Sequence, residues 1–292
     1  MTQTDVVIVS YNSRDHLREA VEPLSRLSDV EVIIVDNASA DGSLDAVSDL
    51  AVTLLPQPDN RGFAHGCNIG WREGSAPFVL FLNPDAELDE TSLRRLVCEV
   101  NGDEGVGAAG PRILESDGTL DFSQRRFPRL RSTYAQALFL HRLAPQAPWS
   151  DELVRDPAAY EQPGSPDWIS GACLLVRRSA LERLGGFDER FFLYCEDLDL
   201  CRRLRDDGIQ IRYVPDAVCV HAGGASAPRP ALLPVLAESR LRYARKYLSR
   251  RAAAFERLGI GLGALTHAAL ARGGAQARRG HLRAFARAAR GG

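Results

Sequence analysis

The first stretch that could do chemistry is Asn83-Pro84-Asp85, which directly follows the five apolar residues Phe78–Leu82. An apolar run without alternation predicts a strand buried on both faces of a parallel sheet. Proline lacks the ladder N–H and restrains the residue before it, so the strand ends there. Asp85 therefore follows the carboxyl end of a central strand, where ligands bind in open α/β sheets. Its carboxylate could cap the next helix, or it could hold a hard metal ion against a diphosphate.

A second acidic stretch, Glu196-Asp197-Leu198-Asp199, opens a predicted amphipathic helix. Acidic residues at a helix start favour the helix dipole, which makes simple capping one explanation. The aromatic residues Phe191, Phe192 and Tyr194 come immediately before the acids. A carboxylate beside apolar rings has a raised proton affinity and suits a general base, which is the second explanation.

Three further positions could contact a nucleotide, a phosphate or a metal. Asp36 ends the predicted strand Val30–Val35, and it could accept hydrogen bonds from a base or a ribose or order the next turn. Arg61 lies at a glycine-bearing helix start, where N–H groups and positive charge suit a phosphate, although the glycines could instead serve close packing. Their spacing is neither a dinucleotide fingerprint nor a P-loop. His221 follows a short strand and precedes a glycine-rich loop over residues 222–228 that looks mobile, so it is a metal or phosphate candidate.

Alternating strands and helices must position these residues. We predict strands at residues 6–10, 30–35, 52–55, 78–82 and 106–109, and helices at residues 14–27, 43–49, 63–72 and 89–100. The pattern continues with strands at residues 168–176, 211–214 and 218–220 and a helix that starts at the acids 196–199. This alternation is typical of an α/β protein with a doubly wound, mostly parallel sheet flanked by helices.

The domain organisation changes near residue 229. We expect one α/β domain over residues 1–228 and a basic helical extension over residues 229–292, with helices at 232–249 and 252–271. Residues 122–166 are rich in proline and polar side chains, which indicates a variable, partly helical insertion. The insertion begins with an arginine run, for which a solvated basic turn is the simple explanation: Arg125, Arg126, Arg129 and Arg131.

The net charge of −2 hides a split between the two parts of the chain. From Ser239 to the end there are thirteen arginine and lysine residues against one glutamate, so this part carries +12 and the remainder −14. An acidic body with a basic, partly apolar tail suggests peripheral contact with an anionic membrane surface. The alternatives are that the tail packs on the acidic body or mediates a homodimer. No nucleic-acid motif accompanies it.

The remaining features favour a reducing compartment. None of the six cysteines forms a Cys-x-x-Cys pair, and several lie in apolar runs, so buried free thiols are expected. The sequence shows neither a signal peptide nor a long apolar span. We therefore expect a cytoplasmic protein.

Six motifs occur in one order along the chain: Val9-Ser10-Tyr11-Asn12, Val35–Ser43, Asn60–Ala64, Asn83-Pro84-Asp85, Trp168–Ala172 and Glu196–Asp199. Any one of them is weak, but six in sequence are specific. From about Val6 to His221 the chain resembles the inverting family 2 glycosyltransferases of GT-A fold, and within them the bacterial rhamnosyltransferases.

The resemblance implies a donor site with a metal ion. Residues that would hold the nucleotide diphosphate are Ser10, Tyr11, Asp36, Asn37, Arg61 and Gly62. Asp85 would bind Mg²⁺ or Mn²⁺, with His221 as a further ligand. Many relatives carry an acid where this chain has Asn83, but the Asn-Pro-Asp form is common among rhamnosyltransferase-like members.

The resemblance also implies an acceptor site. Asp197 would be the general base on the acceptor hydroxyl, with Glu196 beside it, and Trp168 and Gly171 would border the acceptor. The donor favoured by the resemblance is dTDP-rhamnose, and the acceptor is a saccharide or a polyprenyl-diphosphate-linked saccharide whose phosphates the arginine run could hold. A UDP-hexose transferase and a nucleotide-sugar-binding pseudoenzyme are the alternatives within the same fold.

Overall fold

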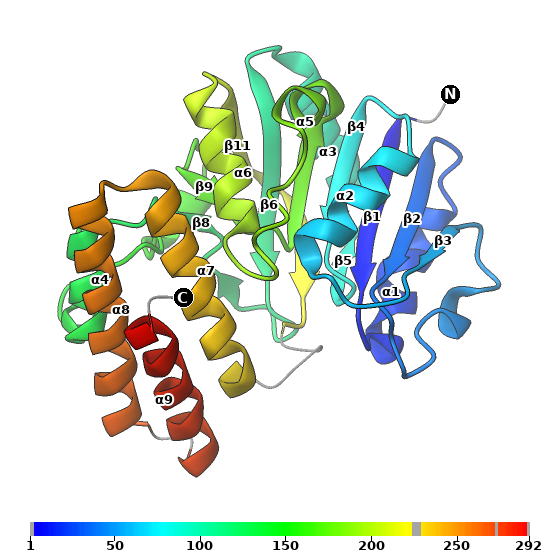
Figure 1. Cartoon of the computed structure of the whole chain (residues 1–292). Helices are drawn as coiled ribbons and strands as arrows, with labels where there is room; N and C mark the ends of the chain where they lie inside the picture. Colours follow the sequence, from blue (N-terminus) through cyan, green and yellow to red (C-terminus); the bar gives the residue numbers. More distant parts are fainter. Residues whose placement is uncertain (1–2, 224–228, 272–273, 291–292) are drawn as a thin grey trace.

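The computed structural model describes residues 3–223, 229–271 and 274–290. Its centre is a nine-stranded sheet in which eight strands follow the order β3-β2-β1-β4-β10-β6-β11-β5, while β7 pairs only with β6. Helices cover both faces of this sheet, and a group of helices lies at the side opposite β1–β3 (Figure 1). The predicted class, an α/β fold with a parallel sheet at its core, is confirmed.

The parallel part of the sheet consists of β1 (Thr4–Ser10), β2 (Val30–Asp36), β3 (Thr53–Pro56) and β4 (Phe78–Leu82). Alternate residues of β1 belong to two separate cores: Val7 and Val9 on one face, Val6 and Ile8 on the other. Burial on both faces explains why these strands read as continuous apolar runs.

The other part of the sheet mixes directions. Strand β10 (Cys173–Arg177) runs antiparallel between β4 and β6 (Val106–Leu114), and β6 pairs in parallel with β11 (Gln210–His221). Strand β5 (Ala86–Leu88) pairs antiparallel with the end of β11, and β7 (Leu120–Asp121) pairs with the end of β6.

Two helical layers bury the sheet. Helices α1 (Arg14–Ser25) and α3 (Glu90–Gly102) contribute side chains to the core on one face. Helices α2 (Phe63–Glu73), α5 (Arg178–Leu184) and α6 (Glu196–Asp206) contribute to the core on the other face. All six cysteines are free and five are buried, as expected for structural thiols.

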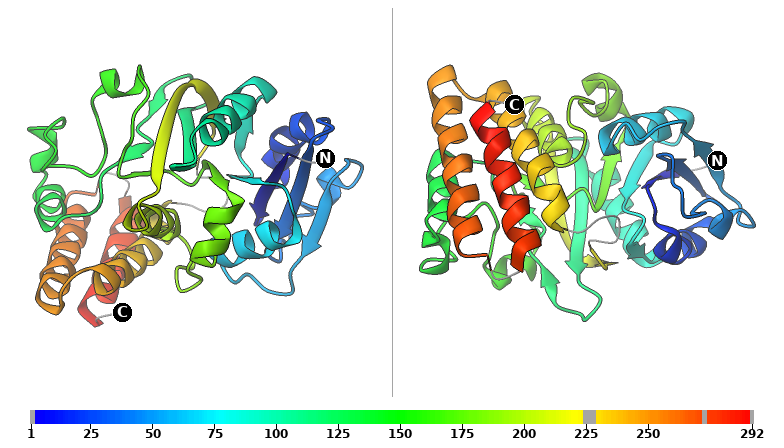
Figure 2. Two further views of the ribbon diagram at one scale, coloured as in Figure 1. Left: turned by 90° about the horizontal axis from the view of Figure 1, so that it is seen from above. Right: turned by 60° about the horizontal axis from the view of Figure 1, so that its bottom comes forward.

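Helices from distant parts of the chain form a bundle beside the sheet (Figure 2). It combines α4 (Leu130–Ala137) of the insertion with α7 (Arg229–Tyr247), α8 (Arg250–Ala269) and α9 (Gly274–Arg290). Two short 3₁₀ helices, η2 (Leu140–Arg142) and η3 (Pro157–Tyr160), complete the insertion. None of the helices in the described ranges is long and apolar enough to cross a membrane.

Several predicted elements were wrong in detail. The helix expected at residues 43–49 is only a 3₁₀ turn, η1 (Asp45–Val47), and the strand expected at 168–176 is divided into β9 (Trp168–Ile169) and β10 by a turn. Strand β9 pairs with β8 (Gln124–Arg125) outside the main sheet, which explains the division.

At the carboxyl end the differences are larger. The two short strands near residues 211–220 are one strand, β11, with an irregular register between Val214 and Val218. The basic extension has a third helix, α9, beyond the two that we placed at 232–249 and 252–271. Most of the glycine-rich loop expected to be mobile, from Gly224 to Pro228, lies outside the described residues.

Candidate active site

The carboxyl ends of β1 and β2 bring together buried polar groups that suit a nucleotide. Ser10 and Asp36 are register partners, and the Asn37 N–H donates to the Ser10 carbonyl over 2.8 Å. Three of the buried side-chain oxygens that have no hydrogen-bond partner among the described residues lie together at this end of the two strands: Ser10 Oγ, Asp36 Oδ1 and Asn37 Oδ1. Such orphans are rare in folded proteins, so they mark a place for a polar ligand. Tyr11 is exposed beside them.

The glycine-bearing start of α2 is locked to the loop that precedes α6. Gly62 has φ of +93°, and a Cβ on it would lie 2.2 Å from the Phe192 carbonyl oxygen. That oxygen accepts the Phe63 N–H at 2.7 Å, and the Asn37 side-chain amide donates to the Gly62 carbonyl at 3.1 Å. The first N–H group of α2 is therefore already bonded, and the exposed Arg61 beside it is a group able to meet a phosphate.

The predicted metal residues meet because β5 pairs with β11. This pairing sets Ala86 opposite His221, so that Asp85 Oδ1 lies 3.2 Å from His221 Nε2. The Asn83 amide nitrogen lies 3.1 Å from the same imidazole nitrogen. Burial alone would lower the pKa of His221, but the hydrogen bond and charge of Asp85 outweigh it and raise the pKa.

The donor atoms fit a divalent cation that is shared with a substrate. Asp85 supplies a carboxylate oxygen and His221 an imidazole nitrogen, and Mn²⁺ accepts both kinds of ligand. In the described part of the chain no group of three His, Cys, Asp or Glu side chains could hold a metal. A cation here would thus need further oxygens from the ligand, as a diphosphate provides.

The predicted general base is held at the first turn of α6 by backbone donors. The Gly171 N–H donates to Asp197 Oδ2 at 2.8 Å, and the Leu198 N–H donates to Oδ1 at 2.7 Å. A Cβ at Gly171 would lie 3.0 Å from that of Asp197, so the glycine permits this close approach. Burial raises the pKa of Asp197 even though the two N–H donors and Arg125 lower it.

The neighbouring acids have different environments. Asp199 is fully buried and accepts from Arg203, from Lys246 Nζ at 2.5 Å and from the Tyr247 hydroxyl at 2.7 Å, so it is an anchor for α7 rather than a base. Glu196 is buried beside the cleft, and burial and the charge of Asp197 raise its pKa well above the usual range.

Two adjacent residues, Gly171 and Ala172, connect Asp197 to the Asn83–Asp85 motif through hydrogen bonds. Gly171 donates to Asp197, and the carbonyl of the next residue, Ala172, accepts the Asn83 N–H at 2.9 Å. The turn between β9 and β10 therefore fixes Asp197, the predicted general base, relative to the Asn83–Asp85 motif at the carboxyl end of β4.

A cleft of about 630 Å³ opens beside Asp197 and extends toward the helical bundle. Trp168 and Glu196 line it, together with Arg125, whose guanidinium lies 5.1 Å from the centre of the Trp168 ring. Of the predicted arginine run only Arg125 lines this cleft; Arg126 bonds the Leu153 carbonyl at 3.0 Å.

Sequence reasoning missed the contribution of α7. Lys246 bridges Asp188 and Asp199, and the buried Arg240 pairs with Glu152 at 2.6 Å and with Glu256 at 3.0 Å. No periodic pattern signals such pairs, because their partners are distant in sequence. The first helix of the basic extension is thus packed on the acidic body.

A sheet with a parallel half, helices on both faces and a cluster of polar side chains at the carboxyl ends of β1, β2 and β4 is typical of the GT-A fold. The family model "Glycosyl transferase family 2" matches residues 5–185, and "Glycosyl transferase family group 2" matches residues 126–267. The chain belongs to glycosyl transferase family 2 and is a glycosyltransferase.

Rhamnosyltransferases are among its relatives. The N-acetylglucosaminyl-diphospho-decaprenol L-rhamnosyltransferase of Mycobacterium tuberculosis is 35% identical over 240 residues, which cover 77% of each chain. Rhamnosyltransferase WbbL of Escherichia coli is 26% identical over 74% of this chain and 82% of its own.

Among solved structures, the mannosyltransferase PcManGT of Pyrobaculum calidifontis, in complex with GDP-Man and Mn²⁺, has a similar fold. The TM-score is 0.60 at 20% identity, covering 99% of this chain and 86% of the other. Glucosyl-3-phosphoglycerate synthase of M. tuberculosis, solved with Mn²⁺ and UDP, gives 0.58 at 17% identity, covering 84% and 80%.

Proposed function

We propose that this glycosyltransferase moves rhamnose from dTDP-rhamnose to a hydroxyl of a lipid-linked saccharide during cell-envelope polysaccharide synthesis. The observation that carries the proposal is the turn at Gly171 and Ala172, which holds Asp197 beside the Asn83–Asp85 motif. The rhamnosyl and lipid-linked parts are supported by the relatives, one of which is named for an N-acetylglucosaminyl-diphospho-decaprenol acceptor.

In this mechanism Asp197 takes the proton of the acceptor hydroxyl as its oxygen attacks the anomeric carbon. The two backbone N–H donors orient the carboxylate, and its raised pKa makes it a stronger base than an exposed aspartate. A single displacement inverts the anomeric centre and needs no covalent intermediate. Ser10, Asp36 and Asn37 supply the buried oxygens that would receive the nucleotide.

Asp85 and His221 would hold Mg²⁺ or Mn²⁺ together with the donor diphosphate. A cation held there would neutralise the charge that grows on the leaving diphosphate. The side-chain amide of Asn83 also faces His221 Nε2.

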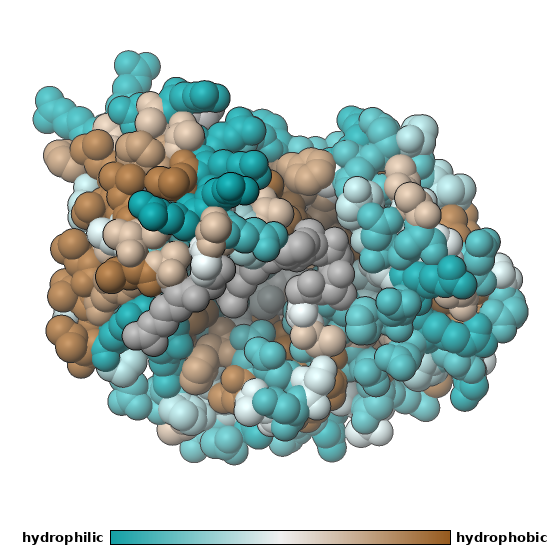
Figure 3. Space-filling view, turned by 90° about the horizontal axis from the view of Figure 1, so that it is seen from below, coloured by the Kyte–Doolittle hydropathy of each residue, from teal (hydrophilic) through white to brown (hydrophobic). Residues whose placement is uncertain are grey.

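We also propose that the enzyme works on the cytoplasmic face of the membrane. Apolar side chains gather on one side of the molecule, over the helical bundle (Figure 3). Among the described residues of α8 and its C-cap, the exposed apolar side chains are Phe255, Leu258, Leu265 and Leu270. Exposed arginines on α9 lie nearby in the bundle, and both features suit an interface with anionic lipids.

Product analysis tests the reaction. We expect transfer of rhamnose from dTDP-rhamnose in the presence of Mn²⁺ and no comparable transfer from UDP-galactose or UDP-GlcNAc. Exclusive use of a UDP-hexose would replace the rhamnosyl assignment while keeping the enzyme class. Donor binding without any hydrolysis or transfer would favour the pseudoenzyme.

Calorimetry of nucleotide binding with and without Mn²⁺ tests the metal site. Asp85→Ala should abolish the tightening that Mn²⁺ gives to dTDP. Glu87→Ala is the matched control, because Glu87 lies on the same short strand but is exposed. Retention of metal-dependent tightening in Asp85→Ala would exclude Asp85 as a ligand.

Vesicle co-sedimentation tests the membrane role. We expect binding to anionic but not neutral vesicles, weakened by salt because surface charge is screened. Equal recovery with neutral vesicles, or no binding at low salt, would remove the electrostatic contact and favour packing or dimerisation as the role of the extension.

A further inference from the structure

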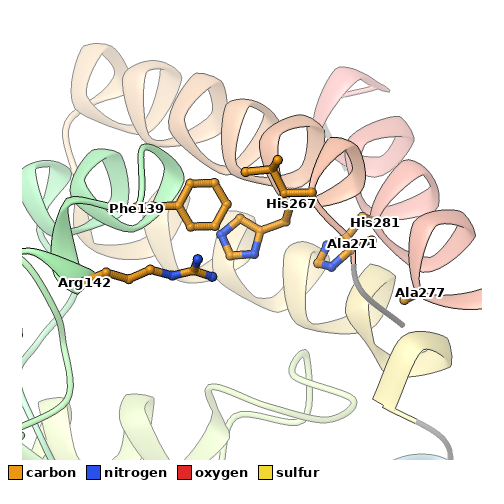
Figure 4. Close-up of a pocket in the computed structure, with 7 residues that line it drawn as sticks. Phe139, Arg142, His267, Ala271, Ala277 and His281 are labelled. Atoms are coloured by element: carbon orange, nitrogen blue, oxygen red, sulfur yellow. The ribbon is translucent and has the colours of Figure 1, made fainter. Parts of the chain in front are cut away.

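A second cavity lies in the helical bundle, where the end of α4 meets α8 and α9. Its volume is about 440 Å³ (Figure 4). Two histidines, an arginine and a phenylalanine line it with Leu270 and small side chains. No acidic residue lines the described part of this cavity, and the imidazole rings of His267 and His281 are 5.5 Å apart.

The side chains of Arg142, Phe139 and His267 are stacked along one wall of this cavity, with the Arg142 guanidinium at the end of the stack. The Arg142 guanidinium lies 4.4 Å from the centre of the Phe139 ring, and that ring stacks on His267 at 4.5 Å with planes 22° apart. Phe139 adopts a φ of +60°, which is uncommon for a residue with a side chain. Arg142 is exposed, and no carboxylate of the described residues lines the cavity, so no acidic side chain there neutralises its charge.

This cavity is connected to the cleft of the general base. His267 lines both spaces, and the cleft that contains Asp197 is also lined by His141. The Nδ1 atom of His141 is buried and has no hydrogen-bond partner among the described residues. A ligand whose hydroxyl lies at Asp197 can therefore extend past His141 and His267 toward Arg142.

A metal is a poor fit for the histidines. Only two of them line the cavity, and no three metal-binding side chains come together in the described residues. Burial lowers the pKa of both His267 and His281, which favours the neutral imidazole with a single N–H. The Nε2 atom of His267 lies 3.4 Å from the Gln136 carbonyl oxygen, so its N–H donates there, and His281 is the imidazole that can donate to a ligand. An arginine beside such a donor suits a phosphate group.

We infer that this cavity binds the diphosphate of a prenyl-diphosphate-linked acceptor, with Arg142 as its main ionic contact and His281 as a hydrogen-bond donor. The inference rests on the proposed function and adds the residues that recognise the acceptor. The lipid chain leaves along Leu270, which lines the cavity and is exposed. The saccharide then occupies the cleft of about 630 Å³ that leads to Asp197.

Binding of farnesyl diphosphate to the whole chain tests this subsite. Calorimetry in EDTA keeps the diphosphate from being held through a metal at Asp85. We expect wild-type binding that Arg142→Ala weakens by roughly tenfold or more, as for loss of a charge-assisted hydrogen bond. Arg257→Ala is the control, because Arg257 is exposed on α8 and lines neither space. Its charge is screened by salt, so its loss should change the affinity by less than about twofold.

Two further arms identify the source of the phosphate. Leu270→Asn should weaken farnesyl diphosphate but leave inorganic pyrophosphate unchanged, because only the lipid contacts the leucine. Equal affinity for the two probes, together with no effect of Leu270→Asn, would show a free-phosphate site and overturn the acceptor assignment. The assignment would also be overturned if neither probe bound to the wild type. It would be overturned as well if Arg142→Ala kept the wild-type affinity for farnesyl diphosphate, or if Arg257→Ala lost as much affinity as Arg142→Ala.

The same variants separate this inference from the proposed function. Binding of dTDP in the presence of Mn²⁺ should be unchanged in Arg142→Ala. The cavity of Arg142 lies in the helical bundle, at the side of the sheet opposite β1 and β2 (Figure 1). Farnesyl diphosphate binding does not depend on which sugar is transferred, so failure of dTDP-rhamnose as donor leaves this test intact.

Discussion

Gly62→Ala tests whether the nucleotide side and the base side of the site are mechanically joined. The new Cβ would lie 2.2 Å from the Phe192 carbonyl oxygen, which is backbone and cannot rotate away. The loop before α6 must therefore shift, and the Phe63 N–H loses its 2.7 Å bond to that oxygen. We expect the free energy of unfolding to fall by roughly 2–5 kcal/mol, from a positive φ on alanine and an overpacked contact.

Gly185→Ala is the matched control. Gly185 also has a positive φ of +74°, but a Cβ there would meet nothing within 4 Å. It should cost only about 1 kcal/mol, the strain of a left-handed alanine. Urea unfolding of the two variants isolates the contact with Phe192.

Transfer kinetics complete this test. Because the shifted loop leads directly into the helix of Asp197, Gly62→Ala should lower kcat, while Gly185→Ala should leave kcat within about twofold, as for a surface change. Equal stability and equal turnover of the two variants would refute the idea that Gly62 couples the two halves of the site.

Three further predictions concern the acids of α6. Asp197→Asn should lower the rate of transfer by roughly 10²-fold or more with donor binding retained, and near wild-type turnover of this variant would exclude Asp197 as the base. In the wild type, the base must be ionised, so kcat/KM should fall as pH drops through a pKa above the usual 3.8. The raised pKa of Glu196 means that the folded state keeps this proton longer than the unfolded chain, so stability falls as pH rises above 4.5, by at most about 1.4 kcal/mol per pH unit. Glu196→Gln should flatten that part of the stability curve in urea titrations at several pH values, and an unchanged slope would contradict the burial argument. Asp199→Asn should cost about 3–5 kcal/mol, because it removes the fully buried carboxylate that pairs with both Lys246 and Arg203. A loss below about 1 kcal/mol, as for a surface pair, would contradict the anchor role.

The sequence could predict the strands because their burial on both faces leaves a local pattern. Runs such as Phe78–Leu82 are apolar without alternation, and the proline after them marks the strand end and the position of Asp85. The acids at the start of α6 were visible for the same reason, since charge and aromatic residues lie side by side in the chain.

Pairings between distant segments left no such pattern. The contact of His221 with Asp85 exists because the three-residue strand β5 turns back onto the end of β11, and a strand of that length has no usable period. The division of residues 168–176 depends on a partner strand in the insertion, more than forty positions away. The roles of Asp197 and Asp199 differ because α7 supplies partners only to the second.

Lys246 has a practical consequence, because it is the only lysine in the chain. Its amine lies between Asp188 and Asp199 at 2.7 and 2.5 Å, and only 22% of the side chain is exposed. Its two ion pairs should slow an amine-directed reagent, and loosening of α7 from Asp188 and Asp199 should speed the reaction. Labelling of Lys246, followed by mass spectrometry of the peptide that contains it, therefore measures how often α7 loosens. Protection of Lys246 by bound ligands would report whether substrates close the catalytic domain onto its helical extension.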